Sequence, residues 1–175
     1  MKTITPKEFI QQVLINEVGE IHERFPYISF ATMAIGIEFL GKCLSNEEDW
    51  NKQGNSKTDF EFAINNLNSF NKYRLFLAKY ELWTSLRNGF LHSFVPKNKL
   101  TLSSKDEMPH LIEHDNDNKL NLKCEDLYSD FKLACEEVIN MTTFSSNKMT
   151  EPLIFVPDIT IDRNISYSGS TYLQI

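Results

Sequence analysis

The chain has 175 residues, of which 41% are hydrophobic and 24% charged, so it is long enough to bury one hydrophobic core. Its net charge of -6 disfavours long-range attraction to nucleic acid, and any contact with RNA or DNA has to be local. No segment is expected to cross a membrane, and the N-terminus lacks the apolar run of a secretory signal, which predicts a cytoplasmic protein. The scattered Cys43, Cys124 and Cys135 are typical of reduced, buried thiols rather than of disulfides or zinc ligands.

The first two predicted helices lie between the N-terminus and residue 44. Thr5, Pro6 and Glu8 form a helix start, with Thr5 as N-cap, proline at the first position and the glutamate of a capping box. Apolar residues at three- and four-residue steps extend this helix to the next proline. A second helix is predicted over 28–44, where small residues on one face allow a neighbouring helix to approach closely.

Two further helices are predicted before residue 96. The stretch T-D-F-E is a second capping-box pattern, so a short third helix is expected to begin at Thr58. The chain from 73 to 95 is apolar on nearly every face until Pro96. This pattern predicts a central helix that is packed by neighbours on several sides.

The remaining segments combine strands with one more helix. Period-two alternation predicts a small β-hairpin or a three-stranded flap, inserted at about 99–123. Helical spacing returns over 125–141, and the tail 151–175 is again predicted to form strands. The expected fold is mainly α, an up-and-down bundle of about five helices with this insert and a strand-rich C-terminal tail. We expect a single domain over 1–175, with a bundle core at about 5–145.

The polar residues of the predicted central helix need an explanation. Four of them lie within about 60° of one another if each residue turns about 100° around the axis: Glu81, Ser85, Asn88 and His92. Arg87 lies about 140° from His92, so it must reach round or the helix must bend. Gly89, between them, allows a bend or the close approach of another backbone. The carboxylates available to a buried arginine are Glu38 and Glu81.

Two interpretations of these residues compete. In the first, Arg87 pairs with a glutamate, while Asn88 and His92 satisfy hydrogen bonds near the end of the helix, and the group is a structural polar network. In the second, the residues line a cleft in which His92 is a general acid or base and Arg87 holds an oxyanion or phosphate. An exposed His92 favours the second interpretation, and an enclosed one favours the first.

The stretch R-N-G-F-L-H, from Arg87 to His92, resembles the R-N-x-x-x-H form of the R-x(4 to 6)-H motif of HEPN domains. These are helical bundles named for higher eukaryotes and prokaryotes nucleotide-binding. The long first helix and the stretch I-G-I-E-F-L-G of the second helix are also similar to that family, and the likeness covers roughly residues 5–145. A phenylalanine, Phe94, stands where one toxin branch of the family has a modified tyrosine.

The resemblance implies a metal-independent endoribonuclease that acts as a homodimer, with the two motifs facing each other in a cleft that contacts RNA. His92 would be the general base or acid in attack of the ribose 2′-hydroxyl on phosphate, Arg87 would stabilise the phosphorane, and Asn88 would orient the pair. Glu38, Glu81 and Ser85 would support them. The resemblance also suggests a toxin–antitoxin or defence setting with an antitoxin or other protein partner. The alternative is a non-catalytic HEPN-like RNA-binding or protein-interaction module.

Other motifs are absent or incomplete. His110 and His114 flank a predicted strand, four residues apart and on one face, but no third ligand accompanies them. The chain has no phosphate-binding loop, dinucleotide fingerprint, nucleophile elbow or zinc-protease motif. We therefore expect no metal and no cofactor.

Overall fold

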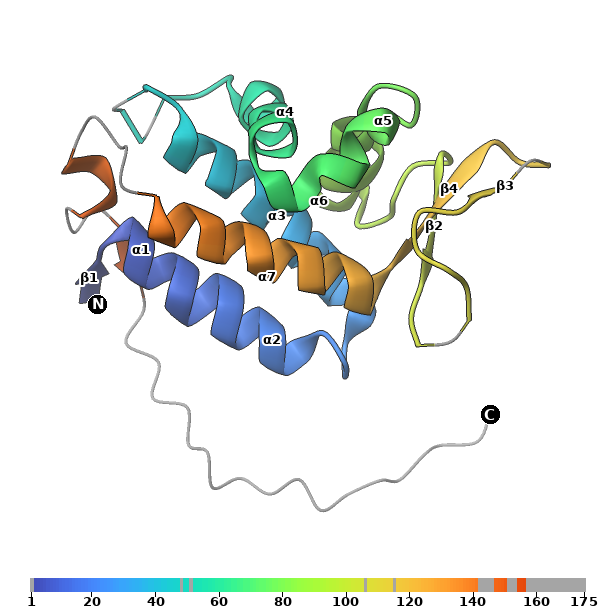
Figure 1. Cartoon of the computed structure of the whole chain (residues 1–175), viewed down its shortest axis with the longest axis horizontal. Coiled ribbons are helices and arrows are strands. Elements are labelled where there is room, and N and C mark those ends of the chain that lie inside the picture. The colour runs from blue at the N-terminus through green and yellow to red at the C-terminus, as the bar shows by residue number, and fades with distance from the viewer. Residues whose placement is uncertain are drawn as a thin grey trace, which may run out of the picture.

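The computed structural model describes residues 2–47, 49–50, 52–105, 107–114, 116–141, 147–150 and 154–156. The chain is mainly helical and carries a small three-stranded sheet, which confirms the predicted mainly-α class. In Figure 1, α7 crosses the molecule between the first helix and the group formed by α4, α5 and α6, and the sheet extends from one end.

The described helical segments fall into two groups. The N-terminal group comprises α1 (Pro6–Phe9), a π-helical segment (Ile10–Glu17), α2 (Val18–Ile21), α3 (Pro26–Leu44) and α4 (Ser56–Asn66). The second group comprises a 3-10 segment (Asn68–Tyr73), α5 (Arg74–Leu77), a π-helical segment (Trp83–Asn88), α6 (Gly89–Ser93), α7 (Cys124–Asn140) and a 3-10 turn (Asn147–Met149).

The start of the first helix is as the sequence predicted. Thr5 is the N-cap, its hydroxyl accepts from the backbone N–H of Glu8, and the Glu8 carboxylate accepts from the backbone N–H of Thr5. This reciprocal pair satisfies backbone groups that a helix start leaves open. The start of α4 differs from the prediction, because Asn55 is its N-cap and Thr58 lies inside the helix.

The predicted single central helix is wrong. The chain between Tyr73 and Pro96 forms α5, a turn, and then the π-helical segment that continues into α6. At the turn Glu81 has a φ of 47°, in the left-handed region that stops a right-handed helix. Phe94, with a φ of 57°, ends α6 in the same way.

The helix α3 holds the described core together. It packs against α4 and α7, and buried side chains such as Met33, Ile37 and Leu40 line its inner side. By length and composition α3 could cross a membrane, contrary to the sequence expectation, and no other described helix could. Half of its most apolar stretch is buried within the fold, which favours a core helix.

The insert is a three-stranded sheet, which is one of the two predicted forms. It consists of β2 (Leu100–Ser103), β3 (Glu113–His114) and β4 (Lys119–Lys123). The central strand β4 pairs antiparallel with β3, as in a hairpin, but parallel with β2. Leu120 and Leu122 of β4 enter the core, and β4 leads directly into α7.

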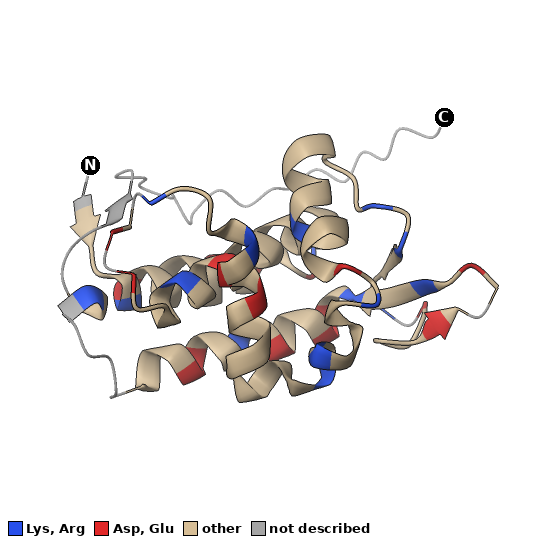
Figure 2. Cartoon of the chain, turned by 90° about the horizontal axis from the view of Figure 1, so that it is seen from above, with Lys and Arg blue, Asp and Glu red and all other residues tan. Residues whose placement is uncertain are grey.

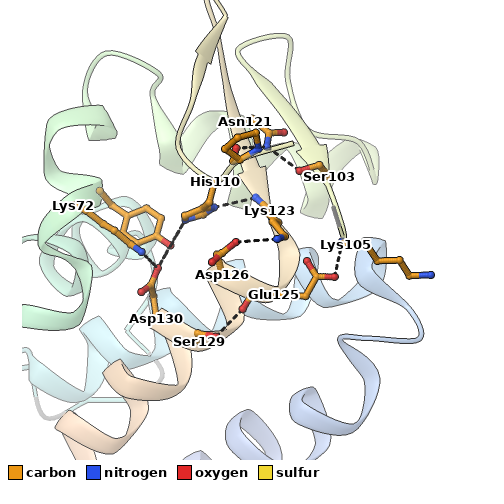
Figure 3. Close-up of polar contacts among 12 residues, drawn as sticks. Lys72, Ser103, Lys105, His110, Asn121, Lys123, Glu125, Asp126, Ser129 and Asp130 are labelled. Atoms are coloured by element: carbon orange, nitrogen blue, oxygen red, sulfur yellow. Dashed lines mark hydrogen bonds and ion pairs between the residues drawn. The ribbon is translucent and has the colours of Figure 1, made fainter. Parts of the chain in front are cut away.

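A chain of hydrogen bonds ties the insert to the bundle (Figure 3). Nδ1 of His110 accepts from the backbone N–H of Lys123, so Nε2 carries the proton of the neutral ring and faces the Tyr73 hydroxyl at 2.7 Å. That hydroxyl donates to Asp130 of α7, which Lys72 also contacts at 2.8 Å. Burial lowers the pKa of His110 to about 4 and raises that of Tyr73, so both stay neutral near pH 7.

The ends of the described chain meet in a second small sheet. The strand β1 (Lys2–Ile4) pairs antiparallel with β5 (Ile154–Val156), which is the part of the predicted C-terminal extension that the structure describes. The rest of the predicted strand-rich tail lies outside the described residues. Cys43, Cys124 and Cys135 are free and buried, and burial raises the pKa of each thiol, in keeping with a structural role.

Candidate functional site

Arg87 and Asn88 lie in the π-helical segment Trp83–Asn88, directly before α6. The backbone N–H of Gly89 reaches the carbonyl of Thr84, five residues back, which is the wider turn of a π-helix. Such a turn changes the angular spacing of side chains from that of the straight helix assumed in the sequence analysis. Glu81 lies in the turn before this segment and Ser85 is buried, whereas His92 is exposed, so the four predicted polar residues do not share one solvent-facing stripe.

Arg87 is held by Glu38 of α3. Nη2 of Arg87 donates to one carboxylate oxygen at 3.2 Å, and Nε lies against the other oxygen without a well-aligned hydrogen bond. The Ser56 hydroxyl donates to the same carboxylate at 2.7 Å and accepts from the indole N–H of Trp83 at 3.1 Å. The Arg87 side chain is 16% exposed, so the pair is largely shielded from solvent. No hydrogen bond from Nη1 is found within the described part of the chain.

His92 lies on α6 and is exposed. Among the residues that the structure describes, its imidazole has no hydrogen bond, ion pair or ring contact. Asn88 lies one helical turn before it, is half-buried, and likewise has no side-chain hydrogen bond to a described residue. No contact joins His92 to Arg87 of the same chain in the described structure. The imidazole and the amide are therefore both free to meet a ligand.

Glu81 and Ser85, the other predicted supporting residues, lie away from Arg87. Glu81 is in the turn before the π-helical segment and pairs with Lys99 at 2.9 Å, and the Lys99 hydrogen bond lowers the pKa of the Glu81 carboxyl. Ser85 is buried, and its hydroxyl donates to the carbonyl oxygen of Tyr80 at 2.8 Å. Of the two carboxylates considered for Arg87, only Glu38 reaches it.

The helices α3 and α6 lie side by side and run in opposite directions. Glu38, late in α3, contacts Arg87, whereas Tyr27, at the start of α3, donates to the carbonyl oxygen of Phe94 at 2.7 Å. The Tyr27 ring also packs edge-on against Phe90, 5.2 Å between centroids. These contacts fix the position of α6 relative to α3.

Exposed apolar side chains flank this pair of helices. They are Tyr27, Ile28 and Ile35 on α3 and Leu91, Phe94 and Val95 at or just after α6. We call this set the α3–α6 surface. Because exposed large apolar side chains are typical of interfaces, and Leu91 directly precedes His92, this set is a candidate contact surface.

The other histidines have structural contacts. His110 uses both ring nitrogens in the network that holds the insert, and His114 lies 3.4 Å from the Thr101 hydroxyl. Nδ1 of His22 donates to the carbonyl of Gly19, and its ring stacks on Tyr128 with 4.0 Å between the centroids. Across the described residues, no group of three or more His, Cys, Asp or Glu side chains is arranged to hold a metal ion.

Sequence reasoning missed several residues around the site. Ser56 and Trp83 fix Glu38, yet Ser56 is 18 residues from Glu38, and no sequence pattern links them. Tyr27 was also missed, because its hydrogen bond to Phe94 spans 67 residues. Lys97 and Lys99 did carry a signal, since the stretch S-F-V-P-K-N-K places two cations just after the motif.

No protein-family model matches this chain, and neither curated proteins nor solved structures give a match. A function therefore has to be argued from the oriented Arg87, the exposed His92 and their surroundings.

Proposed function

We propose that this protein is a metal-independent endoribonuclease of the HEPN type, with a HEPN-like helical bundle and with Arg87, Asn88 and His92 at its active site. The observation that carries the proposal is the exposed imidazole of His92, which has no partner among the described residues and lies five residues after an arginine that Glu38 fixes along one edge. An enclosed His92 would have favoured a structural role. The free Nη1 edge of Arg87 is suited to a phosphate oxygen, since guanidinium groups bind oxyanions through paired N–H donors.

The proposed reaction needs proton transfer and charge stabilisation. A general base takes the proton of the ribose 2′-hydroxyl, O2′ bonds to the adjacent phosphorus, and the bond from phosphorus to O5′ breaks. A general acid returns a proton to O5′, so the products are a 2′,3′-cyclic phosphate and a 5′-hydroxyl. His92 supplies proton transfer, and Arg87 stabilises the negative charge on the phosphorane. Asn88, one turn before His92, orients the imidazole or the phosphate.

A homodimer would provide the second proton-transfer group. One imidazole cannot at the same moment accept the 2′ proton and donate to O5′, whereas two facing copies bring two His92 side chains to one cleft. The α3–α6 surface supports such a dimer, because it places exposed apolar side chains beside His92. The carboxylate of Glu38 holds each Arg87 in place within its own subunit.

The cellular setting follows from the family that the motif resembles. We propose a cytoplasmic protein of a toxin–antitoxin or defence system, in which an antitoxin or another protein partner restrains the nuclease. RNA would contact the dimer cleft locally, in keeping with the net charge of -6.

The experiment is incubation of the purified protein with a mixed RNA pool in EDTA, beside Arg87→Ala and His92→Ala, with the ends of the products identified. Cleavage that yields 2′,3′-cyclic phosphates and is lost in both folded variants is the expected result. Equal cleavage by all three proteins would identify a contaminant and overturn the proposal. Absence of cleavage at every protein concentration and RNA tested would favour the second candidate function.

That second candidate is a non-catalytic HEPN-like RNA-binding or interaction module. One observation favours it, namely that the Glu38 carboxylate neutralises Arg87. Ser56 donates to this carboxylate and Trp83 donates to Ser56, so the residues form a connected network like those with a structural role. In such a module RNA or a protein partner would still bind at the α3–α6 surface. His92→Ala would then change the affinity for RNA or for the protein partner, and neither the wild type nor the variant would cleave RNA.

A further inference from the structure

An open groove lies at the end of α6, and of its lining residues only Val95 also belongs to the α3–α6 surface. Its cavity volume is about 460 Å³, which is in the range of small-molecule sites. Its lining comes from the turn before the π-helical segment and from the chain after α6: Glu81, Ser85, Ser93, Val95, Pro96, Lys97, Asn98 and Lys99. Ser93, which follows His92 directly in the chain, lines the groove, so one wall of the groove is carried by the segment that carries His92.

The backbone of the groove is fixed by close packing. Phe94 ends α6 in the left-handed conformation, and the chain turns back against the helix. A Cβ on Gly89 would lie 2.7 Å from the carbonyl oxygen of Val95, so only glycine lets this segment approach so closely. The backbone N–H of Lys97 then donates to the carbonyl of Ser85 at 2.9 Å. The side chains of Lys97 and Asn98 are thus carried on an anchored segment rather than on a free loop.

The groove has donors that are not used within the fold. Lys99 is occupied by Glu81, at 2.9 Å. The ammonium of Lys97 is exposed and has no ion pair or hydrogen bond to a described residue, and the exposed Asn98 amide also has none. The groove lining holds two cations, Lys99 and Lys97, against one carboxylate, Glu81, whose pKa both lysines lower. The excess positive charge makes the groove locally cationic in an acidic protein.

We propose that this groove binds the nucleotide of single-stranded RNA next to the scissile phosphate, with Lys97 contacting the phosphate of that nucleotide and Asn98 donating to it or to the ribose. The proposal deepens the proposed ribonuclease function and rests on RNA being the substrate. Pro96 gives the groove an apolar wall against which a base can pack. Lys97 is a binding residue here, since it does not touch the reacting atoms.

A role in binding rather than in chemistry has a specific kinetic signature. Loss of a phosphate contact outside the reacting bond weakens the substrate and transition-state complexes alike, so Lys97→Ala should raise KM with little change in kcat. It should also reduce the dependence of affinity on salt, by about 0.7 in the slope of log K against log salt for one contact with a single strand. A structural role for Lys97 would produce neither effect.

The test measures fluorescence anisotropy of a fluorescein-labelled 12-nucleotide RNA with the full chain carrying His92→Ala, which prevents cleavage. Lys97→Ala is added to this background, and Lys132→Ala serves as the matched control, because Lys132 is an exposed lysine on α7 that pairs with Glu136. We expect Lys97→Ala to weaken binding about 5- to 10-fold and to lower the salt slope, with Lys132→Ala within about twofold of the background.

The outcomes separate this groove from the nuclease itself. If the Lys97→Ala and Lys132→Ala proteins bind RNA with equal affinity while the wild type still cleaves RNA, the assignment of RNA binding to the groove is overturned. The proposed ribonuclease activity would not be affected by that result. No RNA binding by any protein, together with no cleavage by the wild type, would overturn both. Displacement of RNA by millimolar inorganic phosphate would identify a general anion site and overturn the RNA assignment.

Discussion

Arg87 has two partners in this account, the Glu38 carboxylate and the RNA phosphate. Glu38 restricts the guanidinium along its Nε–Nη2 edge, which reduces the entropy lost when phosphate binds the other edge. The same carboxylate also lowers the net positive charge that the phosphate meets. An arginine that is oriented but partly neutralised acts mainly through the direction of its donors, so lysine should be a poor substitute.

The buried His110 leads to a prediction about how the free energy of unfolding depends on pH. Its pKa is about 4 in the folded protein against about 6.5 when unfolded, so the unfolded chain takes up the proton first as pH falls. The contribution of neutral His110 to the free energy of unfolding is complete above pH 6.5, and it is lost as the pH falls from 6.5 to 4. His110→Gln cannot titrate, so the advantage of the wild type over this variant should shrink by about 2 kcal/mol between pH 7 and 4.5.

The measurement is urea unfolding of both proteins at the two pH values. Comparing the two proteins cancels the other groups that titrate in this window, including the carboxyl groups of Glu47 and Glu81, whose pKa values are lowered by lysine partners. If wild type and His110→Gln differ in their free energy of unfolding by the same amount at both pH values, the burial of a neutral His110 against Tyr73 is contradicted.

At the element scale, the central segment explains both the success and the failure of the sequence analysis. Residues 73–95 are apolar on nearly every face because neighbours pack around them, and Leu82, Leu86 and Phe90 are indeed buried. The same uniform pattern hides the turn, since neither glycine nor proline marks residues 78–81. Glu81 adopts a positive φ, which costs about 1 kcal/mol outside glycine, and only tertiary contacts reveal it.

Helix boundaries that rest on local chemistry were easier to predict. The capping box at Thr5 involves residues three apart, so sequence alone identified it. The last helix, predicted over 125–141, is α7, Cys124–Asn140, because its apolar spacing is regular. The choice of Glu38 over Glu81 as the partner of Arg87 depends on how α3 packs beside α6, which no local pattern encodes.

The close packing of segment 95–97 against Gly89 of α6 leads to a prediction about stability and RNA binding. Gly89→Ala would place a Cβ 2.7 Å from the Val95 carbonyl and 3.1 Å from the Lys97 nitrogen, so the segment 95–97 must shift. We expect the free energy of unfolding to fall by about 1–3 kcal/mol, although alanine stabilises an unobstructed helix by up to about 1 kcal/mol. RNA binding should weaken in parallel, because the groove changes shape.

Gly19→Ala is the control, measured by the same urea unfolding and anisotropy experiments. Its added Cβ meets the hydroxyl of Tyr128, which donates to the carbonyl of Ile15, so this variant should lose stability at that contact while RNA binding stays unchanged. A Gly89→Ala protein that is as stable as the wild type would show that segment 95–97 is not held against α6.

On the scale of the whole molecule, charge and apolar surface are distributed differently. Figure 2 shows Lys and Arg interspersed with Asp and Glu along the ribbon, so attraction of RNA has to come from a few local groups. Six of the eleven exposed large apolar side chains among the described residues belong to the α3–α6 surface, including Leu91, the chain neighbour of His92. This distribution favours a protein that forms its RNA site by contact between two copies.

The dimer can be tested with one substitution on that surface. Ile35→Glu places a charge on the proposed interface, so a wild-type dimer should become a monomer in sedimentation velocity at micromolar concentration. Leu75→Glu is the matched control, since Leu75 is 81% exposed on α5, away from the α3–α6 surface, and should leave the dimer intact. A wild-type protein that remains a monomer at every working concentration would contradict the paired site.

The central claim is that His92 performs chemistry, and the most direct test is the rate of RNA cleavage in EDTA by the wild type, His92→Ala and His114→Ala. His114 is the matched control because it is a histidine of the insert with a single weak side-chain contact. The account predicts at least a 100-fold loss for His92→Ala, as expected for a general acid or base, and no more than a twofold change for His114→Ala. Equal rates for His92→Ala and wild type would contradict it.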